Sequence, residues 1–184
     1  MAASSLFLLL ALAADYDYVR AGSEADVESA VKGGPVLKGG VVLMGGGKDV
    51  VEAFAWMIER SGGGDFLALR AAGTAAYNSF VLEQGKANSA ATLILRTREA
   101  SSDAFVLERV RQAEAIFIAG GDQWNYIRQW KDTPLAAALQ ERIERGVPIG
   151  GTSAGLAVLG ELFFSADTIQ SLRPKRWRTH STSR

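Results

Sequence analysis

The sequence predicts a single α/β domain built on an open, doubly wound and mostly parallel sheet. Strand-like and helix-like stretches alternate along most of its 184 residues, which is the order expected when helices cover both faces of such a sheet. One strand-like stretch, Ala115 to Ala119, is a continuous apolar run, and strands buried on both faces have that composition. The length suits one domain with a sizeable core.

Composition excludes several classes of function. Lysine plus arginine equals aspartate plus glutamate, 20 of each, so no net charge favours nucleic acid or an anionic membrane as a partner. The absence of cysteine excludes disulfides, thiolate catalysis and cysteine metal sites, and the single histidine, His180, excludes a histidine cluster. We therefore expect neither a metal nor an organic cofactor.

The N-terminus carries an apolar run over residues 6–14, which is too short to span a membrane. Its length suits the core of a signal peptide, and Ala11-Leu12-Ala13 provides a cleavage pattern. We favour a signal peptide over residues 1–14 and hence a secreted protein. The alternative is a buried N-terminal strand or helix in a cytoplasmic protein.

The first clear strand covers residues 40–44 and ends in a turn, Gly45-Gly46-Gly47-Lys48-Asp49, that lacks the spacing of a phosphate-binding loop. Asp49 with Glu52 resembles a capping box at the start of the next helix. Apolar residues then recur at helical spacing until the glycines at 62–64 end that helix.

The same alternation continues toward the C-terminus. The predicted strands cover residues 65–71, 91–97 and 115–119. The first predicted helix covers residues 74–84, and the second begins at the N-cap Ser102. The third follows Gln123, and the fourth runs from Thr133 to Gly146. Thr133 and Pro134 fit the N-cap and first position of the last of these helices, and Gly146 fits its end. Loops at the carboxyl ends of parallel strands form sites, so the Gly45, Gly121 and Ser153 turns can converge.

A second, more specific pattern is Gly151-Thr152-Ser153-Ala154-Gly155, between a predicted strand at 147–150 and an apolar helix-like stretch at 156–159. This is G-x-S-x-G in the strand–turn–helix context of a nucleophile elbow, which strains the serine backbone and needs small neighbours. The following helix would point its first amides at the serine. The alternative is a glycine-rich turn in which Ser153 is only an N-cap.

Several segments together carry a family resemblance. They are Gly45-Gly46-Gly47 with the helix from Asp49, residues 59–66, residues 115–123 with Asn125 and Tyr126, and residues 146–160. With these segments in this order, residues 40–166 resemble the cyanophycinase and aspartyl dipeptidase (dipeptidase E-like) family of serine peptidases. The predicted organisation is a signal peptide (1–14), an extension (15–39), a partial peptidase domain (40–166) and a divergent basic tail (167–184).

The resemblance implies a three-layer sandwich like that of class I glutamine amidotransferases, which is flavodoxin-like. It also implies hydrolysis of aspartyl or isoaspartyl bonds in a small peptide, an isoaspartyl dipeptide or a polymer. Ser153 would be the nucleophile, amides around Gly121, Asp122 and Ala154 the oxyanion hole, and Gln123 a substrate contact. The alternative for Asp122 and Gln123 is a helix N-cap and a surface polar residue.

The resemblance fades after residue 168, where the family would supply the acid and histidine of a triad. Glu161 lies about two helical turns beyond Ser153, and neither it, Asp167 nor His180 can be assigned to the triad. We expect a shortened product, incomplete at its C-terminus. An exposed sheet edge in such a product would favour a homo-oligomer.

Three functions follow from these observations. The first is a serine peptidase, and the second is an inactive relative that binds a small peptide-like ligand. The third, a flavodoxin-like binding domain unrelated to proteolysis, is disfavoured by the order of the matching segments. The basic residues between Arg173 and Arg184 could also indicate a tail that binds nucleic acid, but a solvated, disordered tail explains them more simply.

Overall fold

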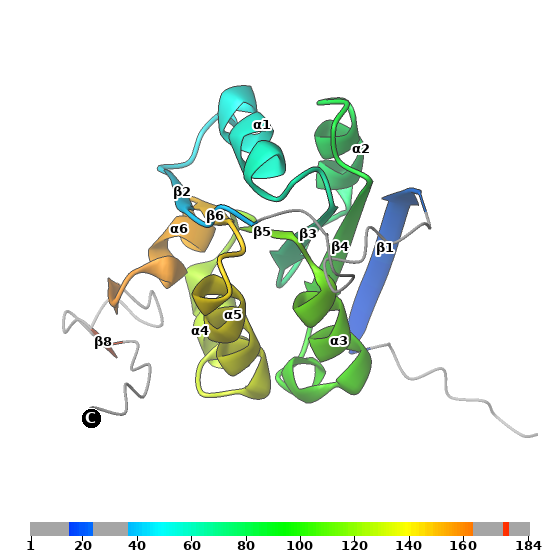
Figure 1. Cartoon of the computed structure of the whole chain (residues 1–184). Coiled ribbons are helices and arrows are strands. Elements are labelled where there is room, and N and C mark those ends of the chain that lie inside the picture. Colours follow the sequence, from blue (N-terminus) through cyan, green and yellow to red (C-terminus); the bar gives the residue numbers. More distant parts are fainter. Residues whose placement is uncertain (1–14, 24–36, 164–174, 177–184) are drawn as a thin grey trace, which may run out of the picture.

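The computed structural model describes residues 15–23, 37–163 and 175–176, and its core is a six-stranded sheet (Figure 1). The strand order is β1-β4-β3-β5-β6-β2, and every neighbouring pair is parallel except β1 with β4. The strands are β1 (Tyr16–Gly22), β2 (Val41–Met44), β3 (Asp65–Arg70), β4 (Ser89–Leu95), β5 (Ala115–Ile118) and β6 (Ile149–Thr152). A separate antiparallel pair joins β7 (Leu162–Phe163) to β8 (Lys175–Arg176).

Helices cover both faces of the sheet, so the predicted doubly wound α/β class is confirmed. On one face lie α1 (Val51–Arg60) and α2 (Ala76–Leu82) (Figure 1). On the other lie α3 (Ala104–Gln112), α4 (Gln123–Trp130), α5 (Pro134–Glu144) and α6 (Ala154–Leu159), with a 3-10 turn, η1 (Glu99–Ser102), before α3. Among the residues that the structure describes, no helix is long and apolar enough to cross a membrane.

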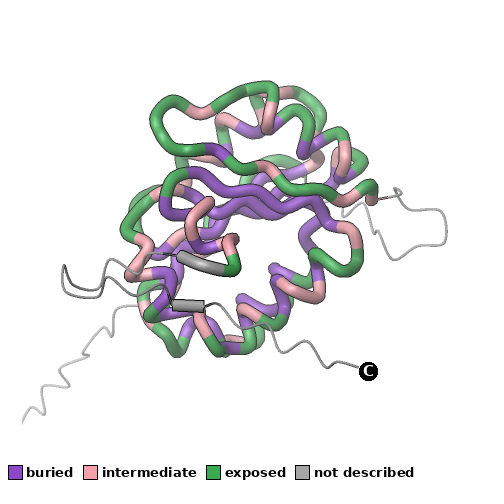
Figure 2. The backbone as a smooth tube through the Cα atoms, turned by 90° about the vertical axis from the view of Figure 1, so that its left-hand side faces the viewer, coloured by how far each residue is buried: buried purple, intermediate pink, exposed green. Residues whose placement is uncertain are grey.

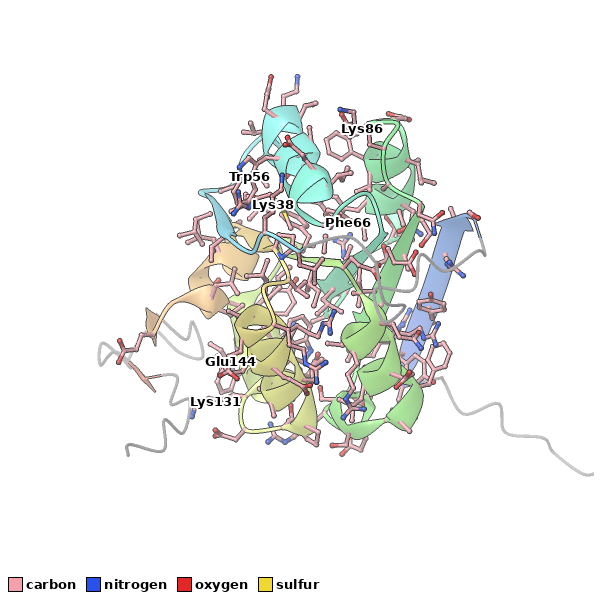
Figure 3. The ribbon with its side chains drawn as sticks, in the orientation of Figure 1. Lys38, Trp56, Phe66, Lys86, Lys131 and Glu144 are labelled. Atoms are coloured by element: carbon pink, nitrogen blue, oxygen red, sulfur yellow. The ribbon has the colours of Figure 1, made fainter. Side chains whose placement is uncertain are left out.

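The core consists of two apolar layers separated by the sheet, whose inner strands are buried along most of their length (Figure 2). The smaller layer centres on Phe54 of α1, which is completely buried and stacks on Phe66 of β3 with the ring centroids 5.9 Å apart. Phe66 is labelled in Figure 3. The larger layer lies under α3 to α6 and includes Trp130, whose ring lies 4.5 Å from that of Tyr126. Burial on both faces explains the continuous apolar run of β5.

Two predicted helix caps are wrong. The cap of α1 is Val50 with no side-chain bond, because the Asp49 carboxylate instead accepts a hydrogen bond from the Tyr77 hydroxyl at 2.9 Å. The cap of α3 is Asp103 rather than Ser102, which lies in η1. Asp103 accepts from the backbone amides of the second and third residues of α3, at 2.8 and 3.2 Å, and so occupies the capping position itself.

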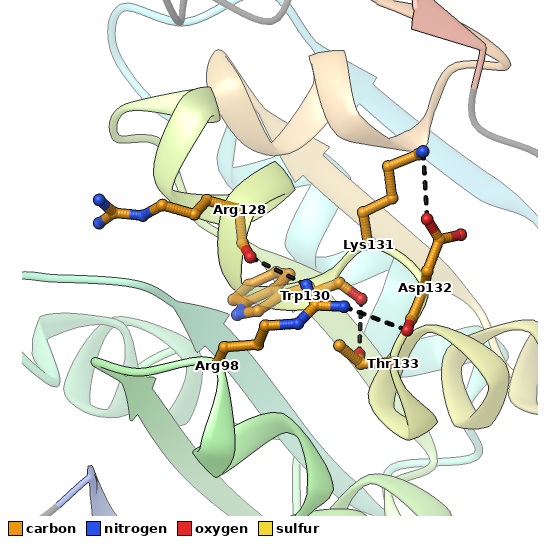
Figure 4. A network of polar contacts seen from close by, with 6 residues as sticks. All are labelled: Arg98, Arg128, Trp130, Lys131, Asp132 and Thr133. Atoms are coloured by element: carbon orange, nitrogen blue, oxygen red, sulfur yellow. Dashed lines mark hydrogen bonds and ion pairs between the residues drawn. The ribbon is translucent and has the colours of Figure 1, made fainter.

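The turn between α4 and α5 follows the prediction and has an additional clamp (Figure 4). Pro134 is at the first position of α5 after the N-cap Thr133, whose hydroxyl donates to the Trp130 carbonyl at 2.5 Å. The Arg98 guanidinium donates to the carbonyls of Arg128 (2.9 Å) and Asp132 (3.2 Å). Because Arg98 is the N-cap of η1, in the segment that follows β4, this clamp ties the end of α4 to that segment.

The strand β1 was not predicted, because residues 16–22 are only partly buried and carry no clear period. The strand lies at one edge of the sheet, antiparallel to β4, with Tyr16 opposite Leu95. Ion pairs join Asp17 to Arg96, and Arg20 to Asp65 at 3.7 Å.

Asn78 of α2 links β1 to the rest of the fold through a buried polar contact. Its side-chain amide donates to the Val19 carbonyl at 2.9 Å, and its carbonyl oxygen accepts from the Thr92 hydroxyl at 2.7 Å. We expect Asn78→Ala to lower the free energy of unfolding by about 2 kcal/mol, because the buried Thr92 hydroxyl and the Val19 carbonyl both lose a hydrogen-bond partner. Urea unfolding measures this, with the exposed neighbour Ser79→Ala as the control; equal effects of the two changes would contradict the prediction.

Several predictions concern residues outside the described part of the chain. They are the signal peptide (1–14), Asp167, His180, and the basic tail apart from Lys175 and Arg176.

Candidate active site

Ser153 forms the sharp turn between β6 and α6. Its backbone has φ 52° and ψ −117°, in the left-handed region that non-glycine residues rarely adopt. The Ser153 amide donates to the Met44 carbonyl at 2.9 Å, and its carbonyl accepts from the Ala157 amide at 3.0 Å. These bonds hold the strained backbone on both sides while the residue stays exposed. The structure therefore forms the strand–turn–helix geometry that was predicted around Ser153.

The strand before Ser153 lies two residues further along the chain than predicted. We expected it over residues 147–150, whereas β6 runs over Ile149–Thr152 and so leads directly into Ser153. The two glycines before the threonine pair with β2 and β5 in full register. Glycine content alone suggested a turn there, but the parallel neighbours on both sides keep the backbone extended.

The glycines of the elbow are needed because backbone atoms lie where their side chains would be. A methyl group on Gly155 would lie 2.0 Å from the Ile118 carbonyl oxygen, and one on Gly151 would lie 2.5 Å from the carbonyl group of Gly155. Neither contact can be relieved by rotating a side chain. Glycine at both positions lets α6 pack directly on β5 and β6, which places its first turn beside Ser153.

The other two predicted turns, after β2 and after β5, meet the Ser153 turn. β5, β6 and β2 are adjacent and parallel, so their carboxyl ends share one edge of the sheet. The Cβ position of Gly46, after β2, lies 3.5 Å from Ser153 Oγ, and that of Gly120, after β5, lies 3.5 Å from Ser153 Cβ. Both glycines leave space around the hydroxyl that a side chain would fill.

The structure places the other predicted residues around this turn in different ways. Asp122 is the N-cap of α4, and its carboxylate accepts from the Trp124 amide at 2.9 Å, which is the simpler of its two predicted roles. Gly121 is exposed and Gln123, the first residue of α4, is half-buried. Ala154 is buried and begins α6, so its amide has no partner within the helix.

Tyr126 supports the Gly120 turn, a role that the sequence analysis did not foresee. Its hydroxyl donates to the carbonyls of Ala119 (2.8 Å) and Gly120 (3.2 Å), and lies 3.2 Å from the Cβ position of Gly121. The side chain is 1% exposed, and this burial raises the pKa of Tyr126 to about 12. Nearby Arg70 lowers that pKa and so opposes the rise.

This raised pKa predicts an alkaline loss of stability. In the folded state the pKa of Tyr126 is above its ordinary value of 10. The contribution of the neutral Tyr126 hydroxyl to the free energy of unfolding is therefore complete below pH 10 and disappears as the pH rises through 12. At roughly 1.4 kcal/mol per pKa unit, the loss by pH 12 is about 2 to 3 kcal/mol. In urea unfolding, the stability gap between wild type and Tyr126→Phe should narrow between pH 10 and 12. A gap independent of pH would contradict the prediction.

The group that would activate Ser153 is not found in the described part of the chain. Within residues 15–23, 37–163 and 175–176 nothing forms a hydrogen bond to Ser153 Oγ. The one imidazole of the sequence, His180, lies outside these residues, as does Asp167. Glu161 is exposed and lies beyond the end of α6. The same residues contain no group of acidic or histidine side chains able to hold a metal ion.

A cavity of about 280 Å³ lies away from this turn, between α5 and α6. Its lining includes Trp130, Leu139, Ile143, Val158 and Glu161. None of the described residues that line it belongs to the predicted site, so the cavity does not extend the arrangement around Ser153.

Part of this chain is similar in sequence to known peptidases. The model of peptidase family S51 matches residues 72–179. A cyanophycinase from Geminocystis herdmanii is 40% identical over 85 residues, which are 46% of this chain and 31% of that protein. A cyanophycinase from Synechococcus elongatus is 36% identical over 75 residues, which are 40% of this chain and 23% of that protein. The alignments thus span a third or less of these curated relatives.

Two solved structures are similar in fold. A peptidase from an acI-B1 Actinobacterium has a TM-score of 0.59 at 22% identity, covering 70% of this chain and 59% of that one. A putative peptidase E protein from Listeria monocytogenes has a TM-score of 0.53 at 20% identity, covering 76% of this chain and 72% of that one. Both likenesses agree with the three-layer arrangement described above.

Proposed function

The chain belongs to peptidase family S51, the cyanophycinase and dipeptidase E-like family, and we propose from this membership that it acts as a serine-type peptidase through Ser153. The observation that carries the proposal is the Ser153 backbone, with φ 52° between β6 and α6. A strained serine is retained at a strand-to-helix turn when the turn exposes its hydroxyl for reaction.

In the proposed reaction, Ser153 Oγ attacks the carbonyl carbon of the scissile peptide bond, and its proton passes to a base. The negative oxygen of the tetrahedral intermediate is stabilised by the Ala154 amide and by amides of the Gly121–Asp122 turn. The C–N bond then breaks, the amine leaves with the proton, and an ester remains on Ser153. Water hydrolyses that ester and restores the hydroxyl.

The proposed substrate is a small peptide or polymer with an aspartyl or isoaspartyl bond. Support comes from the relatives named cyanophycinase and from the resemblance of residues 115–123 to that family. The glycines around Ser153 leave room for substrate backbone to approach the hydroxyl closely. Gln123 begins α4, three residues after the Gly120 that adjoins Ser153, and is the proposed side-chain contact to substrate.

A second candidate function is ligand binding without hydrolysis. The observation that favours it is that no described residue bonds to Ser153 Oγ, since a serine hydroxyl is a weak nucleophile without a base. In this case the elbow and the turns at Gly46, Gly120 and Gly121 would bind a peptide-like ligand, which would then dissociate unchanged.

Labelling with a fluorophosphonate probe separates the two functions. The folded wild-type chain, checked by circular dichroism, should gain one phosphonate on Ser153, detected by mass spectrometry after digestion. Ser153→Ala should remove the label, whereas Ser79→Ala, which changes an exposed serine of α2, should not. An unlabelled but folded wild type would reject the peptidase proposal. Binding of an isoaspartyl-arginine dipeptide by that unlabelled protein, measured by calorimetry, would support the second function.

A further inference from the structure

Arg70 is a charged residue at the carboxyl end of β3 that the proposed reaction does not use. The Ala119 amide donates to the Leu69 carbonyl at 3.0 Å, so Arg70 lies beside Ala119, the residue before the Gly120 turn. Only β5 separates β3 from β6, which places the Arg70 backbone about 10 Å, or two strand spacings, from that of Ser153. Arg70 therefore lies at the same edge of the sheet as the proposed nucleophile.

The Arg70 side chain is held in place by the loop that follows it. Side chains alternate along a strand, so Arg70 projects to the same face as Phe66, the face covered by α1 and α2. Its Nε donates to the Ala72 carbonyl at 2.5 Å, and its Nη1 donates to the Thr74 carbonyl at 2.7 Å. A methyl group on Gly73 would overlap the guanidinium, so the loop wraps closely around it. The cation is thus positioned before a ligand binds.

Two tyrosine hydroxyls show that the guanidinium lies between the two layers of helices. One belongs to Tyr126 of α4, which contacts the Gly120 turn and whose pKa rise the Arg70 charge opposes. The other belongs to Tyr77 of α2. Burial raises the pKa of Tyr77, its hydrogen bond to Asp49 raises it further, and the Arg70 charge again opposes the rise. A position between layers at the carboxyl ends of the strands is where ligands bind in open parallel sheets.

The guanidinium retains N–H donors for a ligand. An arginine has five such donors, and the bonds to Ala72 and Thr74 use two of them. Within the part of the chain that the structure describes, the other three have no acceptor, and no acidic side chain forms an ion pair with Arg70. A planar guanidinium with free donors matches the two oxygens of a carboxylate.

We propose that Arg70 is a specificity-determining residue that binds a free carboxylate on the acyl residue of the substrate, the residue whose carbonyl Ser153 attacks. This inference rests on the proposed function. In an aspartyl or isoaspartyl bond, the acyl residue carries a second carboxyl group whose carbon lies about 4 Å from the scissile carbonyl carbon. Arg70 selects the ionised form of that group and disfavours the same group capped as an amide.

Two dipeptides that differ in a single group test the proposal. Aspartyl-leucine and asparaginyl-leucine are alike except that the asparagine side chain ends in a neutral amide. In Ser153→Ala, which leaves both uncleaved, calorimetry should show that the aspartyl dipeptide binds roughly 10- to 100-fold more tightly. Adding Arg70→Gln should bring this ratio of affinities close to one by weakening the aspartyl complex.

Two further variants separate a contact to substrate from a change in the shape of the loop. Arg70→Lys keeps the charge without the planar fork, so it should leave a smaller preference for the aspartyl dipeptide. Arg96→Gln is the matched control, because it removes the same charge just after β4, one strand further from Ser153, and should keep the full preference. A purely structural role of Arg70 would weaken both dipeptides equally and leave the ratio unchanged.

The outcomes distinguish this inference from the proposed function, which the phosphonate label tests. A chain that is unlabelled but prefers the aspartyl dipeptide through Arg70 would reject hydrolysis and keep Arg70 as the carboxylate contact of a bound ligand. Three results would overturn the inference even if Ser153 is labelled. They are equal affinity for the two dipeptides, no measurable binding of the aspartyl dipeptide at millimolar concentration, and a preference that survives Arg70→Gln.

Discussion

Replacing Gly155 with alanine should remove most of the folded population. The new methyl group would lie 2.0 Å from the Ile118 carbonyl oxygen and 2.8 Å from that of Ala119, and both belong to the backbone of or just after β5. Relief requires α6 to move off the sheet, so we expect a loss of about 3 kcal/mol or more in the free energy of unfolding. Urea unfolding followed by circular dichroism measures this loss.

Gly45→Ala is the matched control for that experiment. Gly45 lies in the turn after β2, has no atom within 4 Å of its Cβ position, and is not among the glycines with positive φ. The same change there should alter the free energy of unfolding by less than about 1 kcal/mol. Equal effects of the two substitutions would show that α6 does not pack against β5 as described.

The second large effect concerns Ser153. If the chain hydrolyses isoaspartyl dipeptides as proposed, Ser153→Ala should lower kcat by roughly 10³-fold or more, because no ester can form. Release of the amine product, followed by chromatography, measures this loss. A Ser153→Ala variant with undiminished turnover would show that the reaction does not use the elbow.

A Ser153→Gly variant distinguishes the effect of losing the hydroxyl from the effect of relieving the backbone strain at residue 153. Glycine adopts the observed φ of 52° without a steric penalty, so this variant should also lack turnover yet exceed Ser153→Ala in unfolding free energy by about 1 kcal/mol. If the two variants were equally stable, the turn would not store strain.

The sequence predicted most of the fold because burial leaves a direct trace in composition. Strands such as Ala115–Ile118 are buried on both faces, so nearly every residue is apolar and the strand is easy to recognise. β1 lies at an edge and alternates weakly, so only its long-range pairing with β4 identifies it. The cap of α1 failed for a related reason. Asp49 bonds to Tyr77, which lies 28 residues further along the chain and only the fold brings close.

Some features of the candidate site were likewise predictable from the sequence, and others were not. The position of Ser153 was predictable because the elbow is a local pattern, and the meeting of the Gly46 and Gly120 turns followed from parallel strand order. The support given by Tyr126 was not predictable, because its aromatic side chain at helical spacing looks like ordinary core. Asp122 was ambiguous, since a carboxylate at a helix start serves equally as a cap or as part of a site.

The pairing of β2 with β6 also determines when the site can form during biosynthesis. Val41 pairs with Ile149, which leaves the ribosome roughly a hundred residues later. Closing so long a loop is entropically unfavourable, and parallel pairings of high contact order form slowly. The β4–β3–β5 part of the sheet can assemble on the nascent chain first, whereas the Gly46 turn must wait for the elbow. Pulsed hydrogen exchange during refolding should accordingly protect the Ser153 amide, which bonds to Met44, after the amides of β3 and β4.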